Sequence, residues 1–586
     1  MTSLQNLLQT SKGFWGIIGS MLLFQFCLGL YSAQKLTVTH DEYWHLPVGL
    51  LSWETGTFDY DRLNPPLIRT WSALPLLFTS AQSGNPAHSS DPADYGDAFL
   101  QANPERYHEY YVLARCSILL LSVITGILLA VWARELFGVS AACLAVFLWS
   151  MSPNILANAA LGTQDLAIAG FFLATVYSGW KFAHNVSWKW ALITGVILGL
   201  AQITKFTAIL LLPILMIEWF LIRFKNSEIK ETLPGKSILA RWGALLLISG
   251  FVLNAGYLFQ GTFQPVSDYQ FQSSELKNLN QLPALLQKIP MPLPRDYLMG
   301  FDLQRFIMQQ THPTYLDSAW ELNGFRSYYL CALLYKLPHA VQFLFLLAVY
   351  CLFKQKKQSA FIPGRILGIL VTPVLLLLVI ATFSNNQLGL RYILPVFPFL
   401  YLLIAPLAEQ LDFYRHKVFS YLVIAAALTL PLSLRFAPDH IAYFNEISGG
   451  PENGDMHLID SNLDWGQDLY RLKDYLHENH ISDIGLAYFG TIPPSTQGIK
   501  YDLPPELRVV PGRYAISVSI LEGRPYSVRK QDGTRHNLGP DMLGYFRFFE
   551  PKARLGYSIN YYELTPEDVV RWQTAVIRAN RNLSPQ

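Results

Sequence analysis

Long apolar runs separated by short polar segments fill the first three quarters of this 586-residue chain. Eleven of them approach the length of about 20 residues that a helix needs to cross a bilayer. They lie near residues 14–31, 112–133, 137–152, 164–182, 189–204, 206–223, 240–260, 328–353, 366–383, 391–408 and 417–434. The pattern predicts an α-helical polytopic membrane protein with about 11 transmembrane helices.

The last 150 residues lose this pattern. Strand-like runs at 456–460, 484–490 and 514–520 alternate with helix-like segments at 469–479 and 566–581. We therefore expect a transmembrane domain over residues 1–434 and a C-terminal α/β domain over residues 435–586. A further segment, 61–78, breaks at Pro65 and Pro66 and then becomes apolar, which predicts a helix lying on the membrane surface.

Lysine and arginine are concentrated in alternate short loops, which orients the chain by the positive-inside rule. These loops carry Lys181, Lys189, Arg223, Lys225, Lys230, Lys236, Arg241, Lys354, Lys356, Lys357, Arg365, Arg415 and Lys417. We expect a cytoplasmic N-terminus and a non-cytoplasmic C-terminus. The outer face then holds residues 32–111, the turn at 153–165, the loop 261–327 and the C-terminal domain.

Composition and motifs exclude several classes of partner and of catalytic site. The chain is 51% hydrophobic and 15% charged with a net charge of +2, so nucleic acid is not expected as a partner. Five cysteines without a C-x-x-C spacing predict neither a disulfide framework nor a zinc site. The first apolar run could also be a cleaved signal, but it is long for one. There is no P-loop, no H-E-x-x-H and no nucleophile elbow.

The stretch THDEYWHL, residues 39–46, places Asp41 and Glu42 just beyond the first apolar run. The pair is either a solvated loop feature or a general base held near the headgroups. His40 and His45 flank it and could complete a metal site, although this spacing does not by itself indicate a metal.

Other ionisable residues stand at the outer ends of apolar runs. Asp165 begins the run 164–182, where it either caps a helix or faces a cavity. Arg69, Lys205 and Arg391 either extend to the headgroups or bind a phosphate. In the C-terminal region, Asp460, Asp464 and Asp468 are expected to cap a helix and to face solvent.

Several stretches, in order over residues 35–480, resemble the bacterial branch of the dolichyl-phosphate-mannose protein mannosyltransferase family. This branch includes the aminoarabinose transferases that modify lipid A and belongs to the GT-C membrane glycosyltransferases. The stretches include HDEYWHLPVGLLSWETG, NPPLIR, LGTQDLAIAGFFLATVY, TKFTAILLLP and LRYILPVFPFLYLL. Two residues depart from the family pattern: Asn64 stands where the protein mannosyltransferases have histidine, and Gln164 precedes Asp165.

The resemblance implies that a sugar is transferred from a polyprenyl-phosphate donor to an acceptor hydroxyl outside the cytoplasm, with inversion of the anomeric carbon. Asp41 would be the catalytic base, Glu42 its support or a donor contact, and Asp165 would orient the acceptor or the loop. Arg69, Lys205 and Arg391 would contact the lipid phosphate. No cofactor is implied, although a divalent metal remains open. The expected location is the bacterial inner membrane.

Two other functions stay open at this point. One is an oligosaccharyltransferase or ligase that uses a diphosphate-linked glycan, although the W-W-D-x-G element of the oligosaccharyltransferase catalytic subunit is not present in the sequence. The other is a transporter whose acids couple ions, although we find neither matched halves nor paired helix breaks. The acceptor is a protein, a lipid or a cell-envelope glycan, and the sequence does not specify the sugar.

Overall fold

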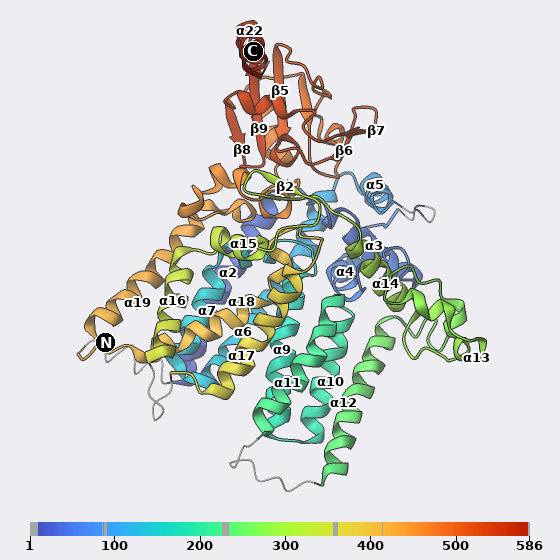
Figure 1. Cartoon of the computed structure of the whole chain (residues 1–586), viewed down its shortest axis with the longest axis vertical. Helices are drawn as coiled ribbons and strands as arrows, with labels where there is room; N and C mark the ends of the chain where they lie inside the picture. The colour runs from blue at the N-terminus through green and yellow to red at the C-terminus, as the bar shows by residue number, and fades with distance from the viewer. Residues whose placement is uncertain are drawn as a thin grey trace.

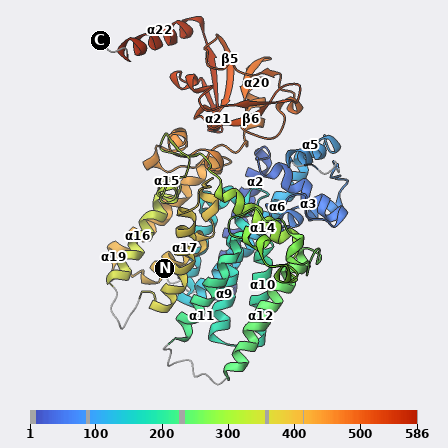
Figure 2. The ribbon, with the colours of Figure 1, turned by 45° about the vertical axis from the view of Figure 1, so that its right-hand side comes forward.

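A computed structural model of the chain describes residues 10–84, 86, 89, 91–224, 234–354, 361–412 and 414–583. Long helices form one body, and a smaller domain containing most of the strands lies at one end of them (Figures 1 and 2). This arrangement confirms the predicted helical membrane protein with a C-terminal α/β domain.

The helices of the membrane region follow the predicted apolar runs. They are α2 (Ser11–Lys35), α6 (Tyr107–Phe137), α7 (Val139–Met151), α8 (Pro153–Ala159), α9 (Asp165–His184), α10 (Trp188–Gln202), α11 (Leu211–Arg223), α12 (Gly235–Gly256), α15 (Tyr328–Lys336), α16 (His339–Lys354), α17 (Gly364–Thr382), α18 (Val396–Ile404) and α19 (Lys417–Thr429).

Within the described ranges, seven helical segments are long and apolar enough to cross a membrane, or nine if each of two bent pairs is one span. The pair α7 and α8 bends by 61° and the pair α15 and α16 by 113°. Pro153 and Pro338 stand at these bends, where a missing backbone N–H ends the helical hydrogen bonding. The predicted number of eleven is not confirmed, because α10 has only 15 residues and α18 only nine.

The described part of the first outer loop contains α3 (Glu42–Thr55), α4 (Leu67–Ala73), the 3-10 helix η1 (Leu74–Phe78) and α5 (Ala93–Ala102). The segment predicted to lie on the membrane surface becomes helical at Leu67, after its two prolines, and α4 lies against α3. The second outer loop contains α13 (Ala284–Gln287), α14 (Arg295–Gln309) and the hairpin of β1 (Thr314–Leu316) and β2 (Ala319–Glu321).

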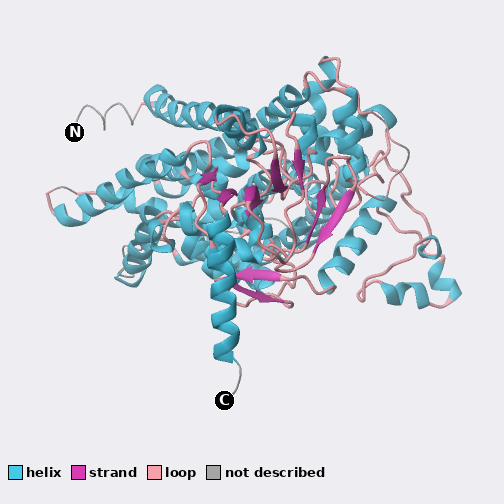
Figure 3. Cartoon of the chain, turned by 90° about the horizontal axis from the view of Figure 1, so that it is seen from above, coloured by secondary structure: helices cyan, strands magenta, loops and turns pink. Residues whose placement is uncertain are grey.

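The C-terminal domain is built on a mixed five-stranded sheet. Its order is β4 (Tyr501–Asp502), β3 (Ile484–Ala487), β5 (Gly512–Ser517), β9 (Ile559–Leu564) and β8 (Ala553–Leu555). The pairs β4–β3 and β3–β5 are parallel, and β5–β9 and β9–β8 are antiparallel. The domain adds α20 (Leu469–Glu478), α21 (Val518–Leu521), α22 (Pro566–Leu583) and the hairpin of β6 (Tyr526–Arg529) and β7 (Arg535–Leu538). Seen from above, the strands lie over the middle of the helical body (Figure 3).

The strand predicted at 456–460 is wrong. Short 3-10 helices, Pro451–Met456 and Asp460–Asn462, reach its two ends, and residues 457–459 between them form no strand. Asp460 has a φ of 60°, which an extended strand does not allow. The boundary between residues 434 and 435 stays a prediction.

Backbone contacts join the C-terminal domain to the first outer loop. The Thr37 N–H donates to the Gln467 carbonyl at 2.8 Å, and the His40 N–H donates to the Trp465 carbonyl at 3.0 Å. The buried ammonium of Lys336 donates to the carbonyls of Ile441 and Asn462 at 2.8 and 2.6 Å. The segments predicted to share the outer face therefore lie at one end of the helices. Which side is cytoplasmic stays a prediction, and Lys225, Lys230, Lys356 and Lys357 lie outside the described residues.

Helices α3 and α4 approach so closely that α3 has room only for glycine at position 49. A Cβ there would lie 2.1 Å from the Arg69 carbonyl oxygen. We expect Gly49→Ala to lower the apparent melting temperature of the detergent-solubilised protein, because overpacking of about 1–3 kcal/mol outweighs the helix propensity gained by alanine. Gly16→Ala in α2 is the matched control, since a Cβ at Gly16 meets no atom within 4 Å. Equal melting temperatures for the two variants would contradict the tight contact.

Candidate active site

Asp41 lies at the end of the short loop that connects α2 to α3. Its Oδ2 is 2.5 Å from Nη1 of Arg391, and its Oδ1 is 3.5 Å from Nδ1 of His40. Arg391 comes from the 3-10 helix η5 (Leu390–Ile393), 350 residues further along the chain. The backbone of this loop is fixed by the C-terminal segment, so the position of Asp41 depends on residues far away in sequence.

The ion pairs continue into the helices. Nη1 of Arg391 is also 3.7 Å from Oδ2 of Asp165, the first residue of α9. Oδ1 of Asp165 is in turn 2.5 Å from Nζ of Lys205, which follows α10. Two carboxylates and two cations thus alternate in one chain, which we call the charge chain: Asp41, Arg391, Asp165 and Lys205. Alternation lets each of these mostly buried charges compensate its neighbour.

Glu42 does not belong to the charge chain. Its carboxylate accepts two hydrogen bonds of 2.8 Å from Arg115, and a third of 2.6 Å from the Gly162 N–H. The Thr39 hydroxyl and N–H also donate to it. Arg115, completely buried in α6, donates in addition to the carbonyls that precede the Asp41 loop, Ala33, Leu36 and Thr37. Glu42 and Arg115 therefore fix the shape of the loop. Arg115 is not among the predicted site residues, although an arginine inside the apolar run 112–133 was a signal that could have identified it.

The guanidinium of Arg69 also forms its hydrogen bonds with backbone carbonyls. Its guanidinium donates to the carbonyls of Phe58, Asp61 and Asn64, and only 4% of the residue is exposed. These bonds order the loop before α4. A contact of Arg69 with the lipid phosphate stays a prediction, and its present partners favour a structural role.

The two residues that depart from the family pattern contact each other. The side-chain amide of Gln164 donates to the side-chain carbonyl of Asn64. This hydrogen bond joins the loop held by Arg69 to the residue that precedes Asp165.

Aromatic residues enclose the cations of the charge chain. The guanidinium carbon of Arg391 lies 4.2 Å from the Trp465 ring centre, and Nζ of Lys205 lies 4.8 Å from that of Tyr392. Trp465 belongs to the C-terminal region, and nothing in the sequence pattern links it to Arg391. Towards the outside, His40 lines a cavity of about 260 Å³ together with Trp44, Tyr526 and Arg529.

The environment keeps both loop carboxylates ionised. Burial raises the pKa of Asp41, but the Arg391 charge and the hydrogen bond with His40 lower it further than burial raises it, so this pKa lies well below its usual range. Burial likewise raises the pKa of Glu42, and Arg115 more than reverses the effect. Asp41 is thus ready to accept a proton, but it is a weak base while Arg391 is bound to it.

Among the described residues, no group of three or more His, Cys, Asp or Glu side chains is placed to hold a metal ion. His40 and His45 are thus not grouped with the adjacent acids in this way.

The aspartates at 460, 464 and 468 are buried, so the expectation that they face solvent is wrong. Asp460 pairs with Arg524 at 2.7 Å, Asp464 accepts from the Ser519 N–H at 3.1 Å, and Asp468 accepts from the Ser558 hydroxyl at 2.7 Å. They join the segment that carries Trp465 to the sheet domain.

Residues 111–253 match the family model described as dolichyl-phosphate-mannose-protein mannosyltransferase. The predicted resemblance to this family is confirmed. The matched mannosyltransferase segment runs from α6 to α12 and includes Arg115, Asp165 and Lys205. The enzyme class of the matched family, glycosyltransferase, is the class predicted from the sequence.

Solved structures of membrane glycosyltransferases are similar to the chain at low identity. The Saccharomyces cerevisiae protein O-mannosyltransferase Pmt1-Pmt2 complex bound to the sugar donor matches with 18% identity and a TM-score of 0.31, over 44% of this chain and 35% of that one. The Archaeoglobus fulgidus oligosaccharyltransferase in the apo form matches with 12% identity and a TM-score of 0.48, over 98% and 85%. ArnT from Cupriavidus metallidurans bound to undecaprenyl phosphate matches with 11% identity and a TM-score of 0.46, over 89% and 97%. No curated protein matches significantly.

Glu42→Gln should destabilise the protein, because it removes the charge that compensates the buried Arg115. Breaking a buried pair typically costs about 3–5 kcal/mol, so we expect a clear fall in the apparent melting temperature of the solubilised protein. Glu109→Gln is the matched control on the same helix as Arg115, since Glu109 pairs with Arg106 at the surface. Melting temperatures that fall equally in both variants would argue against the structural role of Glu42.

The stability of the C-terminal domain should depend on pH through Asp464. Burial raises the pKa of this carboxyl to about 7, against about 3.9 for an unfolded chain. The folded state thus binds the proton more tightly, and the resulting stabilisation is complete below about pH 4 and lost as the pH rises through 7. We expect the melting temperature to fall between pH 5 and pH 8, and Asp464→Asn to reduce this fall. An unchanged pH dependence in the variant would contradict the assignment.

Proposed function

We propose that this protein transfers a sugar from a polyprenyl-phosphate carrier to an acceptor hydroxyl at the non-cytoplasmic membrane face, by a single inverting displacement. Its expected location is a bacterial inner membrane, with the N-terminus in the cytoplasm. The charge chain is the observation that carries the proposal. It brings a carboxylate able to take a proton within reach of two cations that can neutralise a phosphate.

The carboxylate of Asp41 and the two cations of the charge chain have different roles in the reaction. Asp41 takes the proton of the acceptor hydroxyl while the oxygen of that hydroxyl attacks the anomeric carbon. The bond from that carbon to the phosphate oxygen breaks, and the electron pair leaves with the polyprenyl phosphate. Arg391 and Lys205 stabilise the second negative charge that develops on this leaving group. Attack opposite the leaving oxygen inverts the anomeric carbon.

Donor binding would also activate the base. Nε of Arg391 is buried and has no hydrogen-bond partner among the described residues, so its N–H can donate to a further oxygen atom. A phosphate that shares Arg391 weakens its hold on Asp41, and the pKa of Asp41 rises towards its usual value. The carboxylate would then become an effective base only once the donor is in place.

Asp41→Asn should abolish transfer without unfolding the protein. The amide cannot take the proton, and loss of a general base typically costs about 10²–10⁴-fold in rate. The assay uses protein in lipid nanodiscs, a panel of labelled polyprenyl-phosphate monosaccharides and a membrane extract as acceptor source. Asp474→Asn, at an exposed position of α20, is the matched control. Near wild-type turnover by the Asp41 variant would disprove its role as base.

The same assay separates the competing functions. Turnover only with a diphosphate-linked oligosaccharide would indicate an oligosaccharyltransferase or ligase. Movement of labelled substrate across liposomes without any acceptor would indicate a transporter. Parallel reactions with a chelator test whether a divalent metal is needed.

A further inference from the structure

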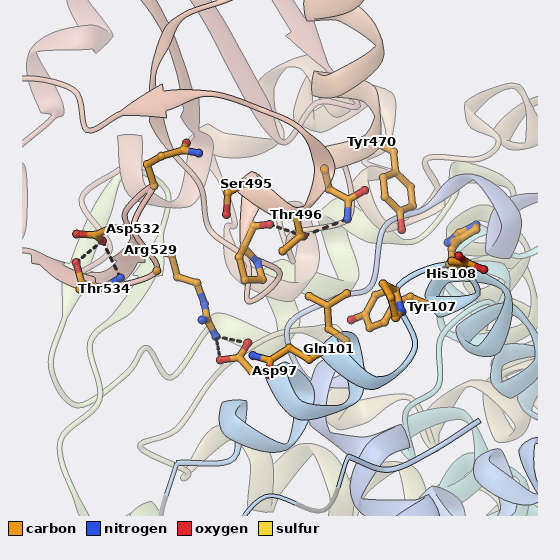
Figure 4. A pocket seen from close by; sticks show the side chains of 17 residues that line it. Asp97, Gln101, Tyr107, His108, Tyr470, Ser495, Thr496, Arg529, Asp532 and Thr534 are labelled. Atoms are coloured by element: carbon orange, nitrogen blue, oxygen red, sulfur yellow. Dashed lines mark hydrogen bonds and ion pairs between the residues drawn. The ribbon is translucent and has the colours of Figure 1, made fainter. Parts of the chain in front are cut away.

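A second cavity, separate from the charge chain, lies between the first outer loop and the C-terminal domain. This cleft has a volume of about 840 Å³. Residues of α5 and the start of α6 form one wall, and the segments 493–497 and 529–534 form the other (Figure 4). It thus opens on the face where the proposed reaction takes place.

The lining of the cleft is typical of a surface that binds sugars. The rings of Tyr107, His108 and Tyr470 lie along it, and the rings of His108 and Tyr470 meet edge to face with centres 5.1 Å apart. Sugar rings present apolar C–H faces that stack on aromatic rings, and their hydroxyls need both donors and acceptors. The side chains of Gln101 and Glu105 offer these groups and have no partner among the described residues.

Aliphatic side chains are scarce in the same cleft. Leu100 is the one aliphatic side chain other than proline among the described residues that line it. An acyl chain, which cannot use the polar groups of the lining, would therefore find few aliphatic partners. The mixture of aromatic rings and polar side chains favours a hydrophilic polymer as the occupant.

The charges of the cleft exclude a strongly anionic occupant. Asp97, Glu105 and Asp532 line it, and Arg529 is the one lysine or arginine among the described lining residues. Arg529 is already neutralised, because it donates two hydrogen bonds of 2.9 Å to Asp97. The remaining excess of negative charge repels phosphate and carboxylate groups.

The cleft is connected to Asp41 by residues that belong to both regions. Arg529 also lines the smaller cavity that contains His40, and His40 contacts Asp41. Asp97 accepts a hydrogen bond from the hydroxyl of Tyr43, two residues after Asp41. Arg529 and Asp97 therefore link the wall of the cleft to the surroundings of Asp41, and a chain that extended from the cleft past Arg529 would approach the carboxylate.

We propose that this cleft binds a neutral glycan, and that the acceptor is a glycan chain whose body lies in the cleft while its terminal hydroxyl reaches Asp41. The inference rests on the proposed function for the role of acceptor, but the binding of the glycan does not depend on turnover.

The test is a binding measurement on the full chain in nanodiscs, with the Asp41→Asn variant so that no transfer occurs. Saturation-transfer NMR compares the neutral tetrasaccharides of β-1,4-glucose, β-1,4-N-acetylglucosamine and α-1,6-mannose with tetragalacturonate and with a serine-rich peptide. We expect at least one neutral tetrasaccharide to bind and the anionic one not to bind. The double substitution Gln101→Ala and Glu105→Ala should weaken binding about tenfold, as expected for two lost hydrogen bonds. Gln573→Ala, at an exposed glutamine of α22, should leave it unchanged.

Binding of no neutral tetrasaccharide, equal binding of the anionic one, or preferential binding of the peptide would overturn the proposal. So would glycan binding that is unaffected by the double substitution. The two proposals fail separately. Turnover without glycan binding removes this inference alone, and glycan binding without turnover on any polyprenyl-phosphate donor removes the proposed reaction while the cleft keeps its ligand.

Discussion

The site depends on the placement of Arg391 between two carboxylates. A guanidinium in this protein interior is costly unless acids surround it, and Asp41 and Asp165 supply that compensation from a loop and from the start of a helix. The same residue lies against Trp465, and the neighbouring Leu390 N–H donates to the side chain of Asn462. Three remote parts of the chain therefore meet at one side chain, and the site is complete only when the C-terminal region is docked on the helices.

The two adjacent acids of the loop, Asp41 and Glu42, have different partners and therefore different tasks. Glu42 and Arg115 form a buried pair whose remaining hydrogen-bonding groups are satisfied mainly by backbone atoms. The pair fixes the loop independently of the contacts of Asp41. Asp41 is held by partners that a substrate can compete for, namely Arg391 and His40. Adjacent carboxylates thus separate into one that maintains geometry and one that can exchange its partner, and under the proposed function only the second takes part in the reaction.

The length of the apolar runs was sufficient to predict the helices, because apolar length is what a bilayer selects. It was not sufficient to count spans, since prolines divide the chain near residues 153 and 338 and the direction of a helix after a break is a tertiary property. The strand predicted at 456–460 was wrong for a reason that is also tertiary. Asp460 takes a left-handed backbone conformation, and its carboxylate pairs with Arg524, which is remote in sequence.

Four of the six predicted site residues, Asp41, Asp165, Lys205 and Arg391, meet in the charge chain. Asp165, Lys205 and Arg391 were recognisable because each is an isolated charge at the end of an apolar run, and Asp41 because it forms an acidic pair with Glu42 just beyond one. Glu42 and Arg69 looked similar in sequence, but their partners are a buried arginine and backbone carbonyls, which no local pattern reveals. The contact of Trp465 with Arg391 could not be predicted, because it arises only from the docking of the C-terminal region on η5.

The contact between Asn64 and Gln164 changes how the two departures from the family pattern are understood. Considered separately, each weakens the inference about the donor. In the structure they form one hydrogen bond between the loop before α4 and the residue that precedes Asp165. A pair of amides satisfies both partners without adding charge, so the balance of the charge chain is unaffected by either residue. The two departures therefore form one local contact beside the site. They leave intact the alternation of carboxylates and cations on which the proposed chemistry depends.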